Sequence, residues 1–261
     1  MDVDLDVCKS IAIRHGLPLQ FVVKEYHVFD VLGQIAGSAS KNNAELIFKG
    51  GTALSKVYFG KAQRFSEDID FDLDADIKTV MQIAKEIAKF VEGYEITEFR
   101  KVHNTVQFYC NYENKLGGKD HVRVDISSKR IITSKPPNAK GATSEFVQST
   151  VMGVRVYEFE DLMARKMNAL SDRTEGKDVY DVYVGLPLCK GMGKAIEQML
   201  KSEERTETAS QFLQKMINAV KKADYKKLRN LTNPFIPVAY RPKDWLGLKN
   251  DLILKLENLK M

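Results

Sequence analysis

Asp68-Ile-Asp-Phe-Asp-Leu-Asp74 is the stretch that decides the fold, because acidic and apolar residues alternate along all of it. Successive side chains of a β-strand point to opposite faces, so the pattern predicts a strand with an apolar face and an acidic face. Aspartate is disfavoured in strands, and such a conflict between propensity and pattern is typical of a functional site. Asp68 and Asp70 would lie on one face about 7 Å apart, a spacing that can share a divalent cation. The alternative is a solvated acidic strand face.

A glycine turn precedes this strand. Glu45-Leu-Ile-Phe48 predicts a short apolar strand that runs into Gly50-Gly51-Thr52, and a helix is expected from Ala53 to Phe59. Glycines let a backbone approach a phosphate closely, and a helix N-terminus offers N–H groups to anions. Thr52 is predicted to cap the helix and contact phosphate, and Lys56 to add positive charge. The order of residues differs from a Walker A loop.

A third carboxylate comes from a later predicted strand, His121-Val-Arg-Val-Asp-Ile-Ser127. Arg123 and Asp125 face one way, and the apolar residues between them face the other. We expect Asp125 to bind metal or to accept the proton of an acceptor hydroxyl, which completes the carboxylate set of two-metal phosphoryl transfer. Hard cations prefer carboxylate oxygens, so the expected ion is Mg²⁺, with Mn²⁺ as a substitute. The alternative is a salt bridge between Asp125 and a neighbouring arginine.

The remaining hydrophobic patterns predict an α+β (α/β) chain. Interleaved helices and strands come first and a run of helices follows, so we expect a core domain over 1–150 and a helical domain over 151–261. The expected elements are two helices over 8–40, a helix over 76–92, hairpin strands at 94–102 and 104–112, a linker over 133–150, and helices beyond 157 with a break at 233–242.

The charge distribution predicts a polyanionic partner. The chain has 261 residues, of which 44% are hydrophobic and 29% charged, as in ordinary globular proteins. Residues 190–261 contain 15 Lys and Arg against 8 Asp and Glu, a net +7, which leaves −2 for the rest of the overall +5. A basic tail suits RNA, although a solvated helical surface is the alternative. The N-terminal residues do not resemble a signal peptide and no apolar run could span a bilayer, so we expect a cytoplasmic protein without membrane contact.

One lysine breaks the pattern of a predicted helix over 158–170. Lys166 falls inside the apolar stripe of that helix, where a lysine is rare without a partner. It could emerge into a cleft and neutralise NTP phosphates, or snorkel at the edge of the stripe. Asp178 and Asp181, one turn apart on the next helix, could pair with Lys166 or Arg173, or orient a base or ribose. Arg64 and Ser66, just before the acidic strand, could contact phosphate or pin the loop.

These motifs resemble those of a known family. Phe48-Lys-Gly-Gly-Thr-Ala-Leu-Ser-Lys56, followed by Arg64-Phe-Ser-Glu-Asp-Ile-Asp-Phe71, is similar to the signature of the AbiEii/AbiGii toxin family. Its members are nucleotidyltransferases with a DNA polymerase β-like core and form the toxin half of type IV-like toxin–antitoxin or phage-defence pairs. The resemblance extends through Val122–Ser127 and Tyr157–Leu170 and covers roughly residues 10–185.

The resemblance implies a nucleotidyltransferase core, with a mixed β-sheet flanked by helices, that transfers NMP from an NTP to RNA, in some relatives tRNA. It implies that Asp68 and Asp70 bind metal, that Asp125 assists, and that the glycine turn grips phosphate. A cognate antitoxin is the implied protein partner. Two readings stay open beside it: transfer to a protein or small-molecule hydroxyl, and a non-catalytic NTP- or RNA-binding regulator.

Overall fold

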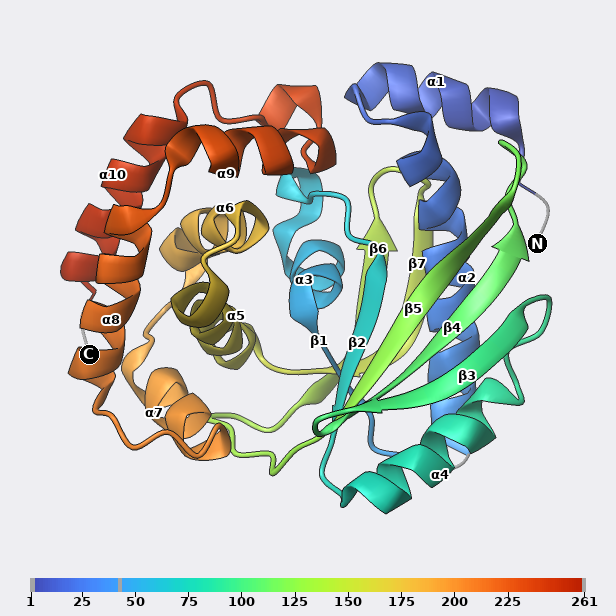
Figure 1. Ribbon diagram of the computed structural model, residues 1–261, viewed down its shortest axis with the longest axis horizontal. Coiled ribbons are helices and arrows are strands. Elements are labelled where there is room, and N and C mark those ends of the chain that lie inside the picture. The colour runs from blue at the N-terminus through green and yellow to red at the C-terminus, as the bar shows by residue number, and fades with distance from the viewer. Residues whose placement is uncertain (1–2, 42–43, 260–261) are drawn as a thin grey trace. The chain divides into compact units, whose positions relative to one another are not determined.

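The computed structural model describes residues 3–41 and 44–259 (Figure 1). The chain forms two compact units: Met1–Ile131 with Pro137–Val156, called here the sheet unit, and Ile132–Pro136 with Tyr157–Met261, called the helical unit. The division lies after Val156 instead of after residue 150, because the last strand of the sheet continues to that residue.

The sheet unit is built on one mixed sheet, which has seven strands within the described residues. These are β1 (Ile47–Lys49), β2 (Asp68–Leu73), β3 (Glu95–Val102), β4 (Thr105–Glu113), β5 (Lys119–Ser128), β6 (Asn138–Ser144) and β7 (Ser149–Val156). Their order is β3-β4-β5-β2-β1-β7-β6. The pairs β2–β5 and β1–β7 are parallel and the other pairs are antiparallel, so the predicted mixed sheet is confirmed.

Helices cover one face of this sheet. The N-terminal helices are α1 (Leu5–His15) and α2 (Leu19–Lys41), and α4 (Ile77–Ala88) follows β2. Both α2 and α4 pack on the sheet and on each other, which places them on the same face (Figure 1). Phe71 of β2 lies on this face, beside Ile35 and Ala39 of α2. Because side chains alternate along a strand, the aspartates of β2 lie on the opposite face.

The predicted linker over 133–150 is wrong for most of its length. Residues 138–156 form the antiparallel hairpin β6–β7, which closes one end of the sheet. The polar composition that suggested a linker belongs to β6, an edge strand whose first residues are exposed. Only the short segment before it passes through the helical unit, where the Asp161 carboxylate accepts hydrogen bonds from the Ser134 N–H and hydroxyl groups at 2.8 Å.

The helix after β1 begins three residues earlier than predicted. Gly50 and Gly51 are not a turn before the helix but its first residues, in α3 (Gly50–Ala53). The helix continues as a π-helical segment over Leu54–Phe59. A π-helix is rare and frequently lies at a functional site.

The helical unit confirms the predicted run of helices. It contains α5 (Phe159–Arg173), α6 (Gly176–Gly185), α7 (Gly193–Ser202), α8 (Ala209–Lys222), α9 (Tyr225–Thr232) and α10 (Trp245–Glu257). The predicted break at 233–242 consists of two 3₁₀ turns, Asn233–Phe235 and Val238–Tyr240. None of the described helices is long and apolar enough to cross a membrane.

Candidate active site

Two predicted site residues are neighbours across the centre of the sheet. Strands β2 and β5 run parallel, and their register pairs Asp70 with Asp125 and Asp68 with Arg123. All four side chains leave the strands on the face opposite Phe71. The tertiary fold therefore brings the carboxylates predicted from two distant segments to one place.

Cationic and amide groups hold this carboxylate cluster. The Arg123 guanidinium donates from Nη2 to Asp68 Oδ2 at 2.6 Å, and its Nε lies 3.6 Å from Asp125 Oδ2. Gln107, the register partner of Asp125 on β4, donates to Asp125 Oδ2 at 3.2 Å. The other oxygen, Asp125 Oδ1, is buried and has no hydrogen-bond partner among the described residues. A buried carboxylate oxygen without a partner is costly, which marks it as an atom available to a ligand.

Burial raises the pKa of both paired aspartates. For Asp70 burial is the largest cause, Lys49 opposes it, and the neighbouring carboxylates of Asp125 and Asp68 add to it, so that the pKa rises to about 6. Burial also raises the pKa of Asp125, against the opposing effect of Arg123. Two like charges held close in a partly desolvated place disfavour ionisation, and a cation between them would relieve that cost.

Gly50 and Gly51 allow the helix start to approach the acidic strand. A Cβ on Gly50, whose φ is +77°, would lie 2.2 Å from Asp70 Oδ2. A Cβ on Gly51 would lie 2.4 Å from Arg64 Nη2 and 3.3 Å from the Ser66 hydroxyl. The glycines thus leave a backbone cradle directly beside the Asp70 carboxylate.

The cluster fits a divalent cation. Carboxylate oxygens are ligands that Mg²⁺ prefers, and the cluster offers Asp125 Oδ1, which has no partner among the described residues, together with the backbone cradle at Gly50. Asp70 and Asp125 would hold the ion, and Asp68 would join them by releasing Arg123. As the side chains stand, no three acidic, histidine or cysteine groups in the described part of the chain are gathered tightly enough to enclose a metal.

Thr52 and Lys56, which were predicted to contact phosphate, instead make contacts that hold the fold together. The hydroxyl of Thr52 is buried inside α3 and donates to the backbone carbonyl of Asp68, so it joins the helix to β2 instead of capping the helix. The ammonium of Lys56 is fully buried and is held by Glu25 and by Gln63 Oε1, the latter at 2.9 Å. Neither group presents itself to a nucleotide, because each is enclosed by its own protein partners.

Arg64 and Ser66 stay close to the cradle. Arg64 is 2% exposed, and its Nη1 donates to the carbonyl of Phe65 at 2.9 Å. Its Nη2 and the Ser66 hydroxyl border the position that a Gly51 side chain would fill. Their geometry supports the view that they pin the loop against the start of the helix.

Lys166 is buried in the helical unit with two carboxylates. Its Nζ lies 2.9 Å from Asp178 Oδ1 and 2.9 Å from Asp181 Oδ2. Arg173 also donates to Asp178, from Nε at 2.7 Å. Burial alone would raise the pKa of Asp178, but the positive charges of Lys166 and Arg173 outweigh it and lower the pKa to about 2. The predicted pairing of Lys166 with the two aspartates is confirmed.

Sequence reasoning missed Lys49 and Gln107. The Lys49 ammonium lies 2.6 Å from Asp72 Oδ1 and 3.1 Å from the Ser127 hydroxyl. Asp72 is therefore a buried ion-pair partner of Lys49. Lys49 could have been predicted as a site residue, because it directly precedes the two glycines in the sequence. Gln107 could not, because its place beside Asp125 depends on the register of β4 and β5.

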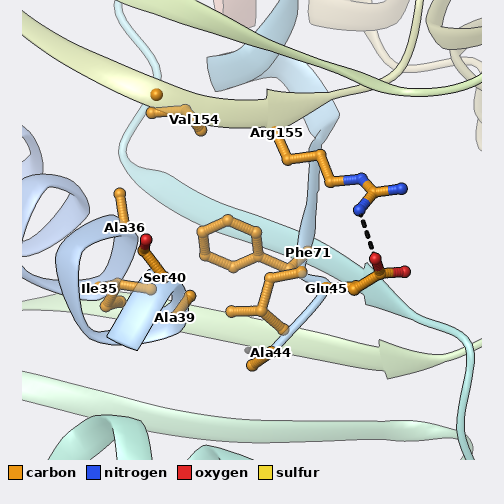
Figure 2. Close-up of a pocket in the computed structure, with 11 residues that line it drawn as sticks. Ile35, Ala36, Ala39, Ser40, Ala44, Glu45, Phe71, Val154 and Arg155 are labelled. Carbon is orange, nitrogen blue, oxygen red and sulfur yellow. Dashed lines mark hydrogen bonds and ion pairs between the residues drawn. The ribbon is translucent and has the colours of Figure 1, made fainter. Parts of the chain in front are cut away.

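A cavity of about 270 Å³ lies on the other face of the sheet (Figure 2). Phe71 and small residues of α2 line it, and the ion pair between Arg155 Nη1 and Glu45 Oε1, at 2.7 Å, closes one side. Because Phe71 and Asp70 point to opposite faces of β2, this cavity is separate from the carboxylate cluster.

The fold defines the class of protein. The chain is similar in structure to the nucleotidyltransferase toxin MenT4 from Mycobacterium tuberculosis, with 16% identity, coverage of 99% of this chain and 91% of that chain, and a TM-score of 0.64. It is also similar to JHP933 from Helicobacter pylori, with 17% identity, coverage of 92% of each chain and a TM-score of 0.59. No curated protein matches the sequence. The α+β fold is thus that of nucleotidyltransferase structures.

The family follows from the sequence itself. Residues 35–246 match the family described as nucleotidyl transferase AbiEii toxin, type IV toxin–antitoxin system. The match covers most of the chain, and the protein belongs to this family. The resemblance expected from the glycine and aspartate motifs is confirmed.

Proposed function

We propose that the protein is a magnesium-dependent nucleotidyltransferase that moves a nucleoside monophosphate from an NTP to a hydroxyl of RNA, with tRNA as the acceptor. In this proposal it is the toxin of a type IV toxin–antitoxin pair, with an antitoxin protein as its partner. The observation that carries the proposal is the pairing of Asp70 with Asp125 across β2 and β5, next to the cradle at Gly50.

Each group of the sheet unit has a place in this reaction. When bound by Asp70, Asp125 and Asp68, Mg²⁺ would neutralise the triphosphate and polarise the reacting phosphate. The N–H groups at the start of the helix from Gly50 would bind phosphate oxygens. Asp125 Oδ1, which has no partner among the described residues, would bind the cation, and Oδ2 of the same carboxylate would accept the proton of the acceptor hydroxyl. The acceptor oxygen then bonds to the α-phosphorus, and pyrophosphate leaves.

Charge supports RNA as the acceptor. The net +7 of residues 190–261 favours a polyanion. In this proposal Lys166 is a catalytic group that neutralises NTP phosphates, and Asp178 binds the nucleotide. The two side chains hydrogen-bond to one another, so they would have to exchange this contact for the nucleotide.

Asp125→Asn tests the proposal. We expect labelled NMP to pass from an NTP to RNA in a mixture of total RNA and total protein, and we expect this variant to lose at least about 10³-fold in rate, since charge and proton acceptor are both lost. Asp74→Asn is the matched control: it removes the same charge from an exposed residue just beyond β2 and should keep the rate within about twofold.

The acceptor that becomes labelled decides between the alternatives. Label found in protein would show that the acceptor is a protein hydroxyl and not RNA. Magnesium-dependent NTP binding without label in any acceptor would make the protein a non-catalytic regulator.

Gly50→Ala should lower the transfer rate about 100-fold. The new Cβ would meet Asp70 Oδ2 and displace the carboxylate, and it would also strain a backbone of positive φ. Gly60→Ala separates the two effects, since Gly60 has a φ of +51° and open space around the position of a Cβ. Steady-state rates and melting temperatures of both variants are the measurement. Equal losses of activity in both variants would show that strain alone matters.

A further inference from the structure

The helical unit contains a cavity of about 580 Å³ that the proposed chemistry does not use. It is formed by the start of α6, the end of α8 and half of α9, which lie together in Figure 1. Its charged lining residues are Arg173, Lys177, Lys222 and Lys227 against Glu175 and Asp224, a net charge of +2. The Asp224 carboxylate is already used, because it accepts the N–H groups of Lys226 and Lys227 as the cap of α9.

The start of α6 opens into this cavity without a side-chain cap. Glu175 occupies the N-cap position but accepts no capping hydrogen bond there. The first N–H groups of a helix that is not capped attract an anion. The N–H groups of Asp178 and Val179 donate to the Glu175 backbone carbonyl, so the start of α6 combines a helix N-terminus without a side-chain cap with surrounding lysines.

A buried hydroxyl beside this helix start also has no partner. Thr232 lines the cavity and is fully buried, and its Oγ1 has no hydrogen-bond partner among the described residues. A Cβ on Gly176, the first residue of α6, would lie 2.0 Å from this oxygen and 2.7 Å from the Leu228 carbonyl. Only a glycine at this position lets α9 approach the start of α6 so closely. Native structures rarely leave a buried hydroxyl unsatisfied, which marks the Thr232 hydroxyl as a group available to a ligand.

A second hollow, of about 600 Å³, extends the cavity along α8. The two share Ala219 and Lys222, and together they are called here the α8 groove. The second hollow is lined by polar side chains and lysines, without an acidic group: Ser171, Gln211, Gln214, Lys215, Asn218 and Lys222. Lys215 and Lys222 are seven residues apart, so they lie about 10 Å apart along one side of the helix.

We propose that the α8 groove binds the sugar-phosphate backbone of the RNA acceptor. This inference rests on the proposed function and adds to it the surface that holds the RNA. One phosphate lies at the start of α6 near Thr232 and Lys227, and the strand continues past Lys222 towards Lys215. Gln211, Gln214 and Asn218 supply amides for ribose hydroxyls, which distinguish RNA from DNA.

Charge and polarity favour RNA over an acidic protein as the occupant. Lysines spaced along a helix with amides between them suit a repeating anionic backbone with hydroxyl groups. The apolar part of the first cavity, at Ala223, Leu228 and Leu231, is small beside this polar surface. Competition with polyglutamate against unlabelled RNA distinguishes the two. Displacement by RNA alone supports the proposal, and equal displacement by polyglutamate overturns it.

The double variant Lys222→Gln/Lys227→Gln tests the groove. Fluorescence anisotropy with a fluorescein-labelled single-stranded RNA, without NTP or metal, should show a Kd about 10-fold higher than that of the unaltered protein. The slope of log Kd against log salt should fall by about 1.4, since two contacts to single-stranded phosphates are lost. The matched control Lys194→Gln/Lys201→Gln removes the same charge from exposed positions of α7 and should change Kd less than twofold. Equal weakening by both pairs would overturn the proposal.

Thr232→Val tests the phosphate at the start of α6. Valine keeps the shape and removes a hydroxyl that has no hydrogen-bond partner in the described part of the chain, so the melting temperature should not fall. RNA affinity should weaken about threefold, and unchanged affinity would contradict a phosphate at this position.

Failure of the groove and failure of the proposed function give different results. Asp70→Asn should bind RNA normally while it transfers no nucleotide. If the lysine variants bind RNA like the unaltered protein while transfer to RNA is intact, the groove is wrong and the function stands.

Discussion

Asp70→Asn is expected to reduce nucleotide transfer by at least about 10³-fold and, in EDTA, to raise the stability of the protein. Activity falls because the paired carboxylates would lose one of two charges that hold the cation. Stability rises because asparagine removes a charge that burial and the nearby Asp125 and Asp68 disfavour. We expect a gain of about 1–2 kcal/mol at pH 8, a part of the cost implied by the raised pKa, because the side chain is only partly buried.

The pH dependence of this difference has a definite sign. The folded pKa of Asp70, about 6, lies above the ordinary value of 3.8, so the folded state holds the proton more tightly than the unfolded state. The aspartate's contribution to stability is therefore lost as pH rises from about 4 to about 6. The advantage of Asp70→Asn should be absent near pH 4 and complete above pH 7. Urea unfolding at a series of pH values measures it, and a constant difference would contradict a titrating Asp70.

Magnesium should reverse the order of stability. A cation that binds only the folded state stabilises it by about 2.7 kcal/mol at one hundred times its Kd, which exceeds the gain of about 1–2 kcal/mol expected for Asp70→Asn. The unaltered protein should gain melting temperature with increasing Mg²⁺, and Asp70→Asn should not. Asp74→Asn, the exposed control, should respond to Mg²⁺ like the unaltered protein. A similar response in Asp70→Asn would exclude Asp70 as a ligand.

Lys166→Met should destabilise the helical unit by about 3–5 kcal/mol. The ammonium lies between two carboxylates that are completely buried, and methionine of similar length fills the space without the charge. Two like charges would then be left close together, with Arg173 still bound to Asp178. Hydrogen exchange over α5 and α6, together with urea unfolding, measures the loss.

Two controls distinguish the loss of the buried ion cluster from the loss of any lysine. Lys201→Met, at an exposed position of α7, should change stability by less than about 0.5 kcal/mol. Adding Asp181→Asn to Lys166→Met should recover part of the loss, because it removes one of the two remaining charges. A double variant that is less stable than Lys166→Met alone would contradict a shared ion cluster.

Local patterns predicted most elements of the fold. The strict alternation from Asp68 to Asp74 predicted β2 and its two faces, and helical periodicity predicted α1, α2 and α4 and the run of helices after Tyr157. Patterns failed where composition and structure disagree. The polar residues of β6 suggested a linker because the strand lies at an exposed edge, and two glycines suggested a turn although they begin a helix.

The sequence by itself determined which face of β2 is acidic, which residue types could hold a cation, and the family to which the chain belongs, because alternation and motif order are local properties. Only the tertiary structure decided that Asp70 pairs with Asp125, that Arg123 binds Asp68, and that the Lys56 ammonium is buried with Glu25. Strand order and register arise from packing between segments far apart in the chain. The type of a residue therefore tells which ligands its side chain could bind, whereas the neighbours that folding brings to it determine whether the side chain is available to bind them.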